Sequence, residues 1–153
     1  MSAAIACSEP RGVVAVVDDD PEIRRALGDW LALAGFEGSG HASAESLLAA
    51  LDADGGKLRL GDDGRAGDPG RLLGAVLDVS LPGVSGVALA RTLRRLAPEL
   101  PLALITALSA EELRRFGCPP AGVPCLRKPF ELEALEAALG AGLFPAAAGG
   151  PAA

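Results

Sequence analysis

One stretch, residues 73–86, restricts the possible folds more than any other part of the chain. It begins with the apolar run Leu73-Gly74-Ala75-Val76-Leu77 and reaches a single carboxylate at Asp78. A Pro/Gly turn then leads to Ser85, a residue type that often caps helices. The pattern predicts that Asp78 stands at the carboxyl end of a buried strand, where open α/β sheets bind ligands. A lone aspartate there is more often an ordinary turn residue, so the rest of the chain has to decide its role.

A second apolar run, Val13–Val17, ends in three aspartates at positions 18–20. A continuous run of this kind is typical of a strand covered on both faces, as in parallel sheets. Asp20, followed by proline, predicts the start of a helix and is interpreted as its cap rather than as a ligand. Helical spacing of apolar residues continues to Gly35, and Trp30 on the apolar stripe is predicted to pack in the core.

The remaining patterns complete an alternation of strands and helices. Further strands are predicted at 36–42, 101–105 and 123–126, and further helices after Ser43, after Ser85, after Ser109 and over the leucines 132, 135, 139 and 143. Residues 52–71 carry six glycines and five aspartates, so they are interpreted as a flexible insertion that stays out of the core, at the amino end of the Asp78 strand. Five strands and five helices predict an α/β fold, a three-layer doubly wound sandwich with a five-stranded parallel sheet of flavodoxin-like order 2-1-3-4-5.

Length and charge limit the number of domains and the kinds of partner. The 153 residues suffice for one core, and we expect a disordered leader at 1–11, one domain at 12–144 and a disordered tail at 145–153. The net charge of −6 and the scattered basic residues argue against binding to nucleic acid, which needs a basic face. No apolar run approaches the ~20 residues needed to span a bilayer, so no membrane partner is expected.

The cysteines indicate the compartment. Three cysteines at positions 7, 118 and 125, without a signal peptide, fit a reducing cytoplasm. Together with the single histidine, His41, they lack the spacing of zinc ligands.

Polar side chains follow four of the five predicted strands: Asp18 and Asp19, Asp78, Thr106, and Lys128. The ends of parallel strands lie side by side, so these groups are expected to converge in one pocket. Three adjacent carboxylates repel one another unless a cation neutralises them, and oxygen ligands suit Mg²⁺. The set points to phosphoryl chemistry, with Asp78 as the best-placed nucleophile and with Thr106 and Lys128 binding phosphoryl oxygens.

Four segments of the chain resemble the signature segments of the response-regulator receiver domain of two-component signalling. They are Val16–Asp20, Leu77–Gly86, Ile105–Ala107 and Lys128–Phe130, in family order and nearly at family spacing apart from the insertion. The resemblance extends from about Gly12 to Leu143 and implies a single-domain receiver similar to the chemotaxis Y proteins. Thr106, Lys128 and the acids are all kept, whereas receivers that have lost phosphate control usually lack one of these residues.

The resemblance also implies the roles of the site residues. Asp78 would be the phosphoacceptor, and Asp19, Asp78 and the backbone carbonyl of Ser80 would ligate Mg²⁺ directly, with Asp18 acting through water. Thr106 and Lys128 would contact the phosphoryl group. The peptide bond between Lys128 and Pro129 would be cis.

The implied function is a switch that accepts a phosphoryl group from a histidine kinase or phosphotransfer protein and signals to a downstream protein by a change of conformation. Such a domain is no conventional enzyme, yet it catalyses its own phosphorylation and the hydrolysis of its aspartyl phosphate. We expect a cytoplasmic monomer or weak homodimer. Two alternatives stay open: an adaptor that binds partners without phosphate control, and the receiver part of a longer regulator.

Two features depart from the family pattern. Family members commonly carry an aromatic residue three positions before the active-site lysine, and here that position is Cys125. The insertion at 52–71 is the second departure. Neither affects the phosphorylation chemistry, but the first concerns how the signal is read out.

Overall fold

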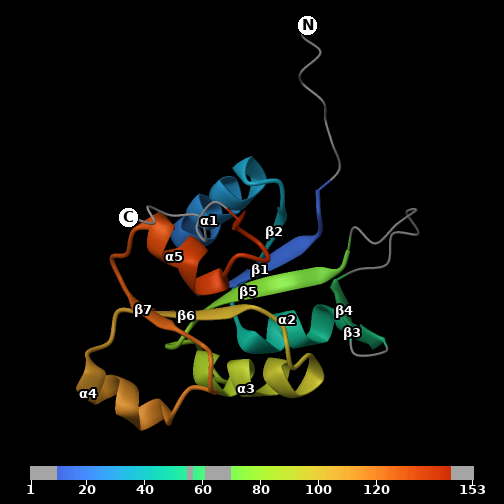
Figure 1. Ribbon diagram of the computed structural model, residues 1–153. Coiled ribbons are helices and arrows are strands. Elements are labelled where there is room, and N and C mark those ends of the chain that lie inside the picture. The colour runs from blue at the N-terminus through green and yellow to red at the C-terminus, as the bar shows by residue number, and fades with distance from the viewer. Residues whose placement is uncertain (1–9, 55–56, 61–69, 146–153) are drawn as a thin grey trace, which may run out of the picture.

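The computed structural model describes residues 10–54, 57–60 and 70–145, so most of the predicted leader and tail and part of the insertion lie outside the described residues. Five parallel strands form a central sheet between two layers of helices (Figure 1). The sheet order is β2-β1-β5-β6-β7, which is the predicted order 2-1-3-4-5. The strands are β1 Val13–Val17, β2 Glu37–His41, β5 Leu72–Asp78, β6 Leu102–Thr106 and β7 Cys125–Arg127.

Five helices cover the sheet, as predicted. Helices α1 (Pro21–Leu33) and α5 (Leu132–Leu139) lie on one face, and α2 (Ala44–Ala50) and α3 (Gly86–Leu96) lie on the other (Figure 1). The short helix α4 (Ala110–Leu113) continues into a 3-10 turn, Arg114–Phe116, before Gly117.

The alternation of side chains along β1 divides the core into two clusters. Val14 and Val16 pack with the residues of α1 and α5, whereas Val13, Ala15 and Val17 pack with those of α2 and α3. All five residues are buried, because both faces of this strand are covered. Burial of each of the four valine side chains contributes about 1.5–3 kcal/mol, so the strand is fixed in register from both sides.

The helix starts were predicted from capping residues, and the structure confirms them. Asp20 accepts a hydrogen bond from the Glu22 amide, and Ser43 and Ser85 cap α2 and α3 in the same way. At the start of α4, Ser109 and Glu112 form a reciprocal capping box.

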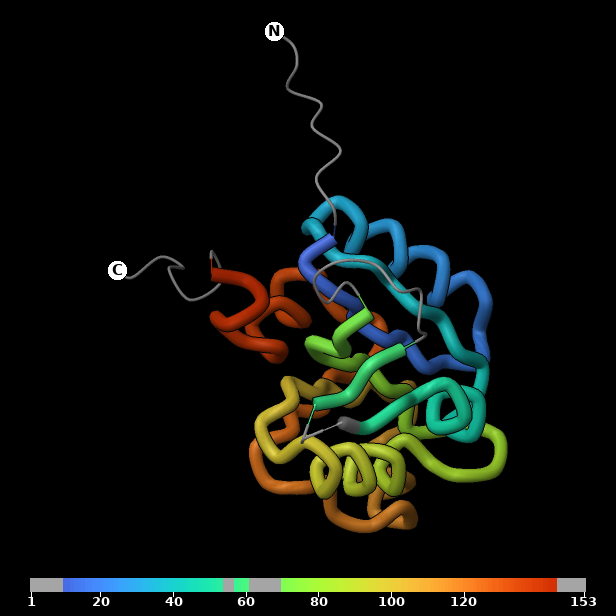
Figure 2. Tube along the Cα trace, turned by 90° about the vertical axis from the view of Figure 1, so that its right-hand side faces the viewer, coloured from blue at the N-terminus to red at the C-terminus, as the bar shows by residue number. Residues whose placement is uncertain are grey.

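The described part of the insertion is structured, so the prediction that it stays out of the core was wrong. Strands β3 (Leu51–Asp54) and β4 (Lys57–Leu60) pair antiparallel, and Leu58 is only 2% exposed within the core cluster of α2 and α3. The pair lies at the amino end of β5, since the Leu60 amide donates to the Gly70 carbonyl. That edge of the molecule faces the viewer in Figure 2.

The last helix is shorter than its leucine pattern predicts. It ends at Gly140, whose φ of 95° favours glycine, and Leu132 is 41% exposed instead of buried. Leu132 is the first residue of this helix. Leu143 and Phe144 fold back onto the core, where Phe144 stacks on Trp30 at 5.1 Å between ring centroids. Trp30 therefore packs against the core as predicted, although it remains half-buried.

Candidate functional site

The sheet brings the predicted polar residues to one edge. Asp78 is the last residue of β5, and Asp18 follows β1, its neighbour in the sheet. Thr106 ends β6 on the other side of β5, and Lys128 follows β7. The predicted convergence is what parallel strands in this order produce at their carboxyl ends.

Three carboxylates form the centre of this edge. Asp18, Asp19 and Asp78 each offer an oxygen atom, and these atoms lie within 4.8 Å of one another. Asp18 and Asp78 are buried, whereas Asp19 is exposed to solvent. The cluster therefore has a closed side against the sheet and an open side through which a ligand can enter.

Lys128 is the cation that balances the two buried acids. Its Nζ donates to Asp18 Oδ2 at 2.8 Å and to Asp78 Oδ2 at 3.4 Å. The backbone amide of Lys128 also donates to the Thr106 carbonyl at 2.7 Å, which fixes the end of β7 against β6. The peptide bond between Lys128 and Pro129 is cis, as the family resemblance implied.

Backbone groups and one arginine hold Asp18 in place. Its Oδ1 accepts from the Asp20 amide at 2.9 Å, so Asp20 serves both as helix cap and as support for the site. The Arg24 guanidinium donates to the Asp18 carbonyl at 2.7 Å, and the Asp18 amide donates to the His41 carbonyl. Sequence reasoning missed Arg24 and His41, because nothing in a local pattern tells which side chain of α1 turns back to β1 or which residue of β2 lies beside it.

Asp78 is held by the turn that follows it. Its Oδ1 accepts from the Ser80 amide at 3.2 Å. Gly86 begins α3 directly against Asp78, and a Cβ atom at this position would overlap the Asp78 carbonyl oxygen. A glycine is thus required here for close approach, and its place in the Leu77–Gly86 motif has a steric reason.

Thr106 is buried at the end of β6, and its Oγ1 accepts from the Leu108 amide at 3.0 Å. This bond joins the hydroxyl group to the loop that precedes α4. Cys125, the position that departs from the family, is half-buried opposite Leu104 in β6 and packs against the core cluster of α2 and α3. Burial raises the pKa of its thiol, so the side chain is neutral at physiological pH.

The electrostatics of the cluster fit a cation-binding site. Burial, and next the charge of Asp18, raise the pKa of Asp78 to about 6, although Lys128 opposes this shift. Burial alone would lower the pKa of Lys128, but the hydrogen bond to Asp18 and the charge of Asp78 outweigh it and raise that pKa. One lysine does not neutralise three carboxylates. An oxygen-only donor set with surplus negative charge suits a hard divalent cation, so the residues present fit Mg²⁺.

Comparison with known proteins agrees with this arrangement. The sequence profile of the response regulator receiver domain matches residues 73–140. The BeF3 activated DrrB receiver domain superposes with a TM-score of 0.59 at 29% identity, over 81% of this chain and 90% of that one. This chain carries a response-regulator receiver domain. Receivers of this family are phosphoacceptors of two-component signalling and work with histidine kinases or phosphotransfer proteins, which confirms the function class expected from the motifs.

Two relatives show how much of a longer protein this receiver matches. The C4-dicarboxylate transport transcriptional regulatory protein DctD of Rhizobium meliloti is 37% identical over 94 residues, which is 61% of this chain and 17% of that protein. The transcriptional regulatory protein FixJ of the same species is 32% identical over 130 residues, or 82% of this chain and 55% of that protein. The receiver thus spans less than two thirds of the length of these relatives. Within its described residues, no helix is long and apolar enough to cross a membrane.

Proposed function

We propose that Asp78 accepts a phosphoryl group from a phosphohistidine donor. The other polar residues at the carboxyl ends of the strands position this phosphoryl group and assist its later removal. The observation that carries this proposal is the contact of Lys128 Nζ with both Asp18 and Asp78 beside an exposed third acid, Asp19. The adaptor alternative is not favoured, because the relatives are response regulators, and the residues proposed for phosphoryl transfer lie together at one edge of the sheet.

Transfer requires Asp78 to act as a nucleophile. One carboxylate oxygen of Asp78 attacks phosphorus, the bond from phosphorus to the donor imidazole nitrogen breaks, and the electron pair of that bond leaves with the imidazole. Lys128 already points its ammonium group at Asp78, so it is placed to hold a phosphoryl oxygen where negative charge gathers. Hydrolysis reverses the modification: water attacks phosphorus, the bond to Asp78 breaks, and inorganic phosphate leaves.

Asp19, Asp78 and the Ser80 carbonyl are proposed to hold Mg²⁺, with Asp18 reached through water. The ion, when bound, neutralises negative charge on the carboxylates and on the phosphoryl oxygens. Thr106 is proposed to donate its hydroxyl hydrogen to a phosphoryl oxygen and to transmit its presence to the loop after β6.

A small phosphodonor tests this assignment without knowledge of the cognate kinase. Acetyl phosphate with Mg²⁺ is expected to add one phosphoryl group to the wild-type chain by intact mass, and none to the Asp78→Asn variant. Asp20→Asn is the matched control, since asparagine caps helices as well as aspartate does and the hydrogen bond from Asp20 to Asp18 is donated by the backbone amide, which the substitution keeps. Asp19→Asn removes one proposed ligand and is expected to raise the Mg²⁺ concentration needed by roughly tenfold or more. A persistent phosphate adduct on Asp78→Asn would overturn the proposal.

A further inference from the structure

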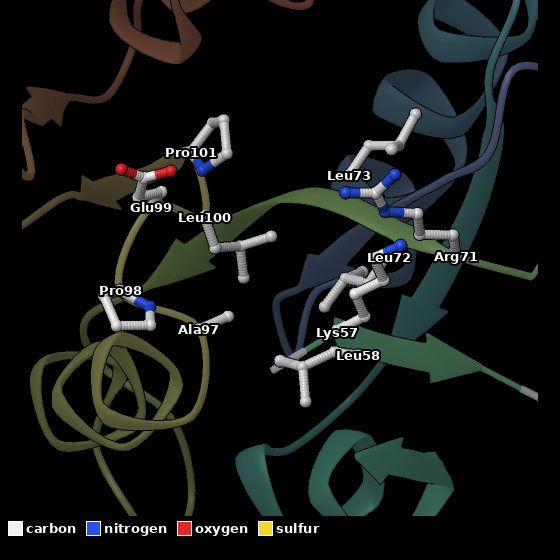
Figure 3. Close-up of a pocket in the computed structure, with 10 residues that line it drawn as sticks. All are labelled: Lys57, Leu58, Arg71, Leu72, Leu73, Ala97, Pro98, Glu99, Leu100 and Pro101. Atoms are coloured by element: carbon white, nitrogen blue, oxygen red, sulfur yellow. The ribbon is translucent and has the colours of Figure 1, made fainter. Parts of the chain in front are cut away.

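A pocket lies at the opposite edge of the sheet from the acid cluster, at the amino end of β5 (Figure 3). Its volume is about 640 Å³, within the range of cavities that hold small organic molecules. Strand β4 and the start of β5 form one wall, and the connection 97–101 between α3 and β6 forms the other. The wall from β4 belongs to the insertion, one of the two features that depart from the family pattern.

The base of the pocket is apolar. Leu58, Leu72 and Leu100 line it, and each is at most 7% exposed because each also packs in the core cluster of α2 and α3. Strand β4 produces this base by simple alternation: Leu58 faces inward between two exposed or half-exposed basic neighbours. An apolar body placed in the pocket would rest on these three side chains.

The rim is cationic. Lys57 and Arg71 line it, and among the lining residues that the structure describes Glu99 is the one acid. Figure 3 shows the Arg71 guanidinium extending toward Leu100 and Pro101, while Glu99 stands on the far side of the opening. Neither Lys57 nor Arg71 makes an ion pair in the described ranges of the chain.

This local excess of positive charge is unusual for a chain whose net charge is −6. Two exposed cations at the rim of an apolar cavity attract an anion and repel a cation. Arginine in particular presents a planar fork of donors that matches a carboxylate or another oxyanion.

We propose that this pocket binds a small amphipathic organic anion, a compound with a carboxylate head and an apolar body of the size of a medium-chain fatty acid. The head group contacts Arg71 and Lys57, and the body lies on Leu58, Leu72 and Leu100. The proposal does not rest on phosphorylation of Asp78, because the pocket and the acid cluster lie at opposite ends of β5.

Three probes that share a chain length and differ in charge test this site. Octanoate, octanol and octylammonium are titrated separately into the labelled full chain, and backbone amide shifts are followed by NMR. Octanoate is expected to shift the amides of Lys57, Leu58, Leu72 and Leu100 in a saturable manner, with no change at Asp18 or Asp78. It is expected to bind about fivefold or more tightly than octanol, and octylammonium is expected not to saturate.

Variants then test the role of the two cations. Arg71→Gln is expected to weaken octanoate binding about fivefold, and Lys57→Gln combined with Arg71→Gln about tenfold or more. Arg25→Gln is the control, because Arg25 is exposed on α1 away from the pocket, and it is expected to leave the affinity unchanged. Unchanged amide shifts outside the pocket show that each variant is folded. Equal binding of all three probes, shifts that map elsewhere, no saturation with octanoate, or an unaffected double variant would each overturn the proposal.

Discussion

The two ends of strand β5 carry opposite chemistry. At its carboxyl end, Asp78 is buried beside Asp18, and Lys128 is bonded to both. At its amino end, Lys57 and Arg71 are exposed at the rim of an apolar pocket and make no ion pair in the described part of the chain. The charged groups are therefore paired with one another at the carboxyl end of β5 and exposed to solvent at its amino end.

This difference has a physical consequence. A cation that neutralises buried carboxylates contributes to folding, because removing it leaves those acids without a partner in a medium of low polarity. A solvated cation at a rim contributes little to folding and can serve a ligand instead. Stability measurements on matched variants can therefore distinguish the two ends.

The largest expected effect is on stability at the carboxyl end. Lys128→Met keeps much of the side-chain volume and removes the charge, so in metal-free buffer at neutral pH it is expected to lower the free energy of unfolding by about 3 kcal/mol. Lys57→Met at the other end is expected to change it by at most about 0.5 kcal/mol. Urea unfolding in the presence of a chelator measures both. Equal losses in the two variants would contradict the contrast between the ends of β5.

The amino end contributes to folding through its apolar base rather than through its charges. Leu58→Ala is expected to cost about 2–3 kcal/mol, since the side chain is buried in the core cluster. Leu33→Ala is the control, because Leu33 is 90% exposed and its truncation should have almost no effect. A loss below about 0.5 kcal/mol for Leu58→Ala would show that β4 does not hold its place against the core in solution.

Patterns that depend on neighbours in the chain were readable from the sequence. The strands, the caps at Asp20 and Ser109, and the approach of Asp18, Asp78 and Lys128 follow from apolar runs that end in polar residues. Parallel topology then brings such ends together without further information.

What the sequence did not show depends on contacts between distant segments. Gly55 and Gly56 lie between two stretches in which apolar and polar residues alternate, and this sequence pattern indicates a hairpin. The many glycines and aspartates of residues 52–71 instead favoured the interpretation as a flexible insertion, so β3 and β4 were not predicted. Leu58 counts as core only because β4 lies against the start of β5. Arg24 reaches the Asp18 carbonyl from α1, and that contact depends on how the helix packs on the sheet.

A smaller effect concerns charge at Asp78 itself. The folded-state pKa of Asp78 is raised from 3.8 to about 6, so the folded chain binds this proton more tightly than the unfolded chain does. The stabilising contribution of the proton is fully present below about pH 4 and is lost as the pH rises through about 6. Asp78→Asn avoids that loss and is expected to stabilise the metal-free chain at pH 7.5 by about 1–3 kcal/mol.

Denaturation across pH checks the sign of this effect. The advantage of Asp78→Asn is expected to shrink as the pH falls from 7.5 through 6 and to be small near pH 4. Asp52→Asn is the comparison, because Asp52 lies on β3 at the amino edge of the sheet, away from the acid cluster. If Asp78→Asn folds but has a lower free energy of unfolding than the wild type at pH 7.5, favourable pairing of the Asp78 carboxylate outweighs the cost of its burial and of the nearby Asp18 charge.

The smallest expected effect is the change of conformation on phosphorylation, where Cys125 replaces the usual aromatic residue. Thr106 Oγ1 accepts from the Leu108 amide, so drawing the hydroxyl group toward a phosphoryl oxygen must either pull the loop with it or break this bond. One hydrogen bond is worth only about 1 kcal/mol, and a population shift cannot exceed the difference in interaction energy between the two states.

We therefore expect the signal to travel through the backbone of residues 107–109 and α4, with little rotamer change at Cys125. Amide shifts with and without the fluoride analogue of the phosphoryl group should differ most at Leu108 and along α4, and not at Leu58 or Leu72 at the amino end of β5. In the alternative interpretation, Cys125 is a small core residue without a signalling role, which agrees with its packing against the core cluster of α2 and α3. Unchanged shifts from Ala107 to Phe116, with saturation at Asp78 shown independently, would mean that this loop carries no signal.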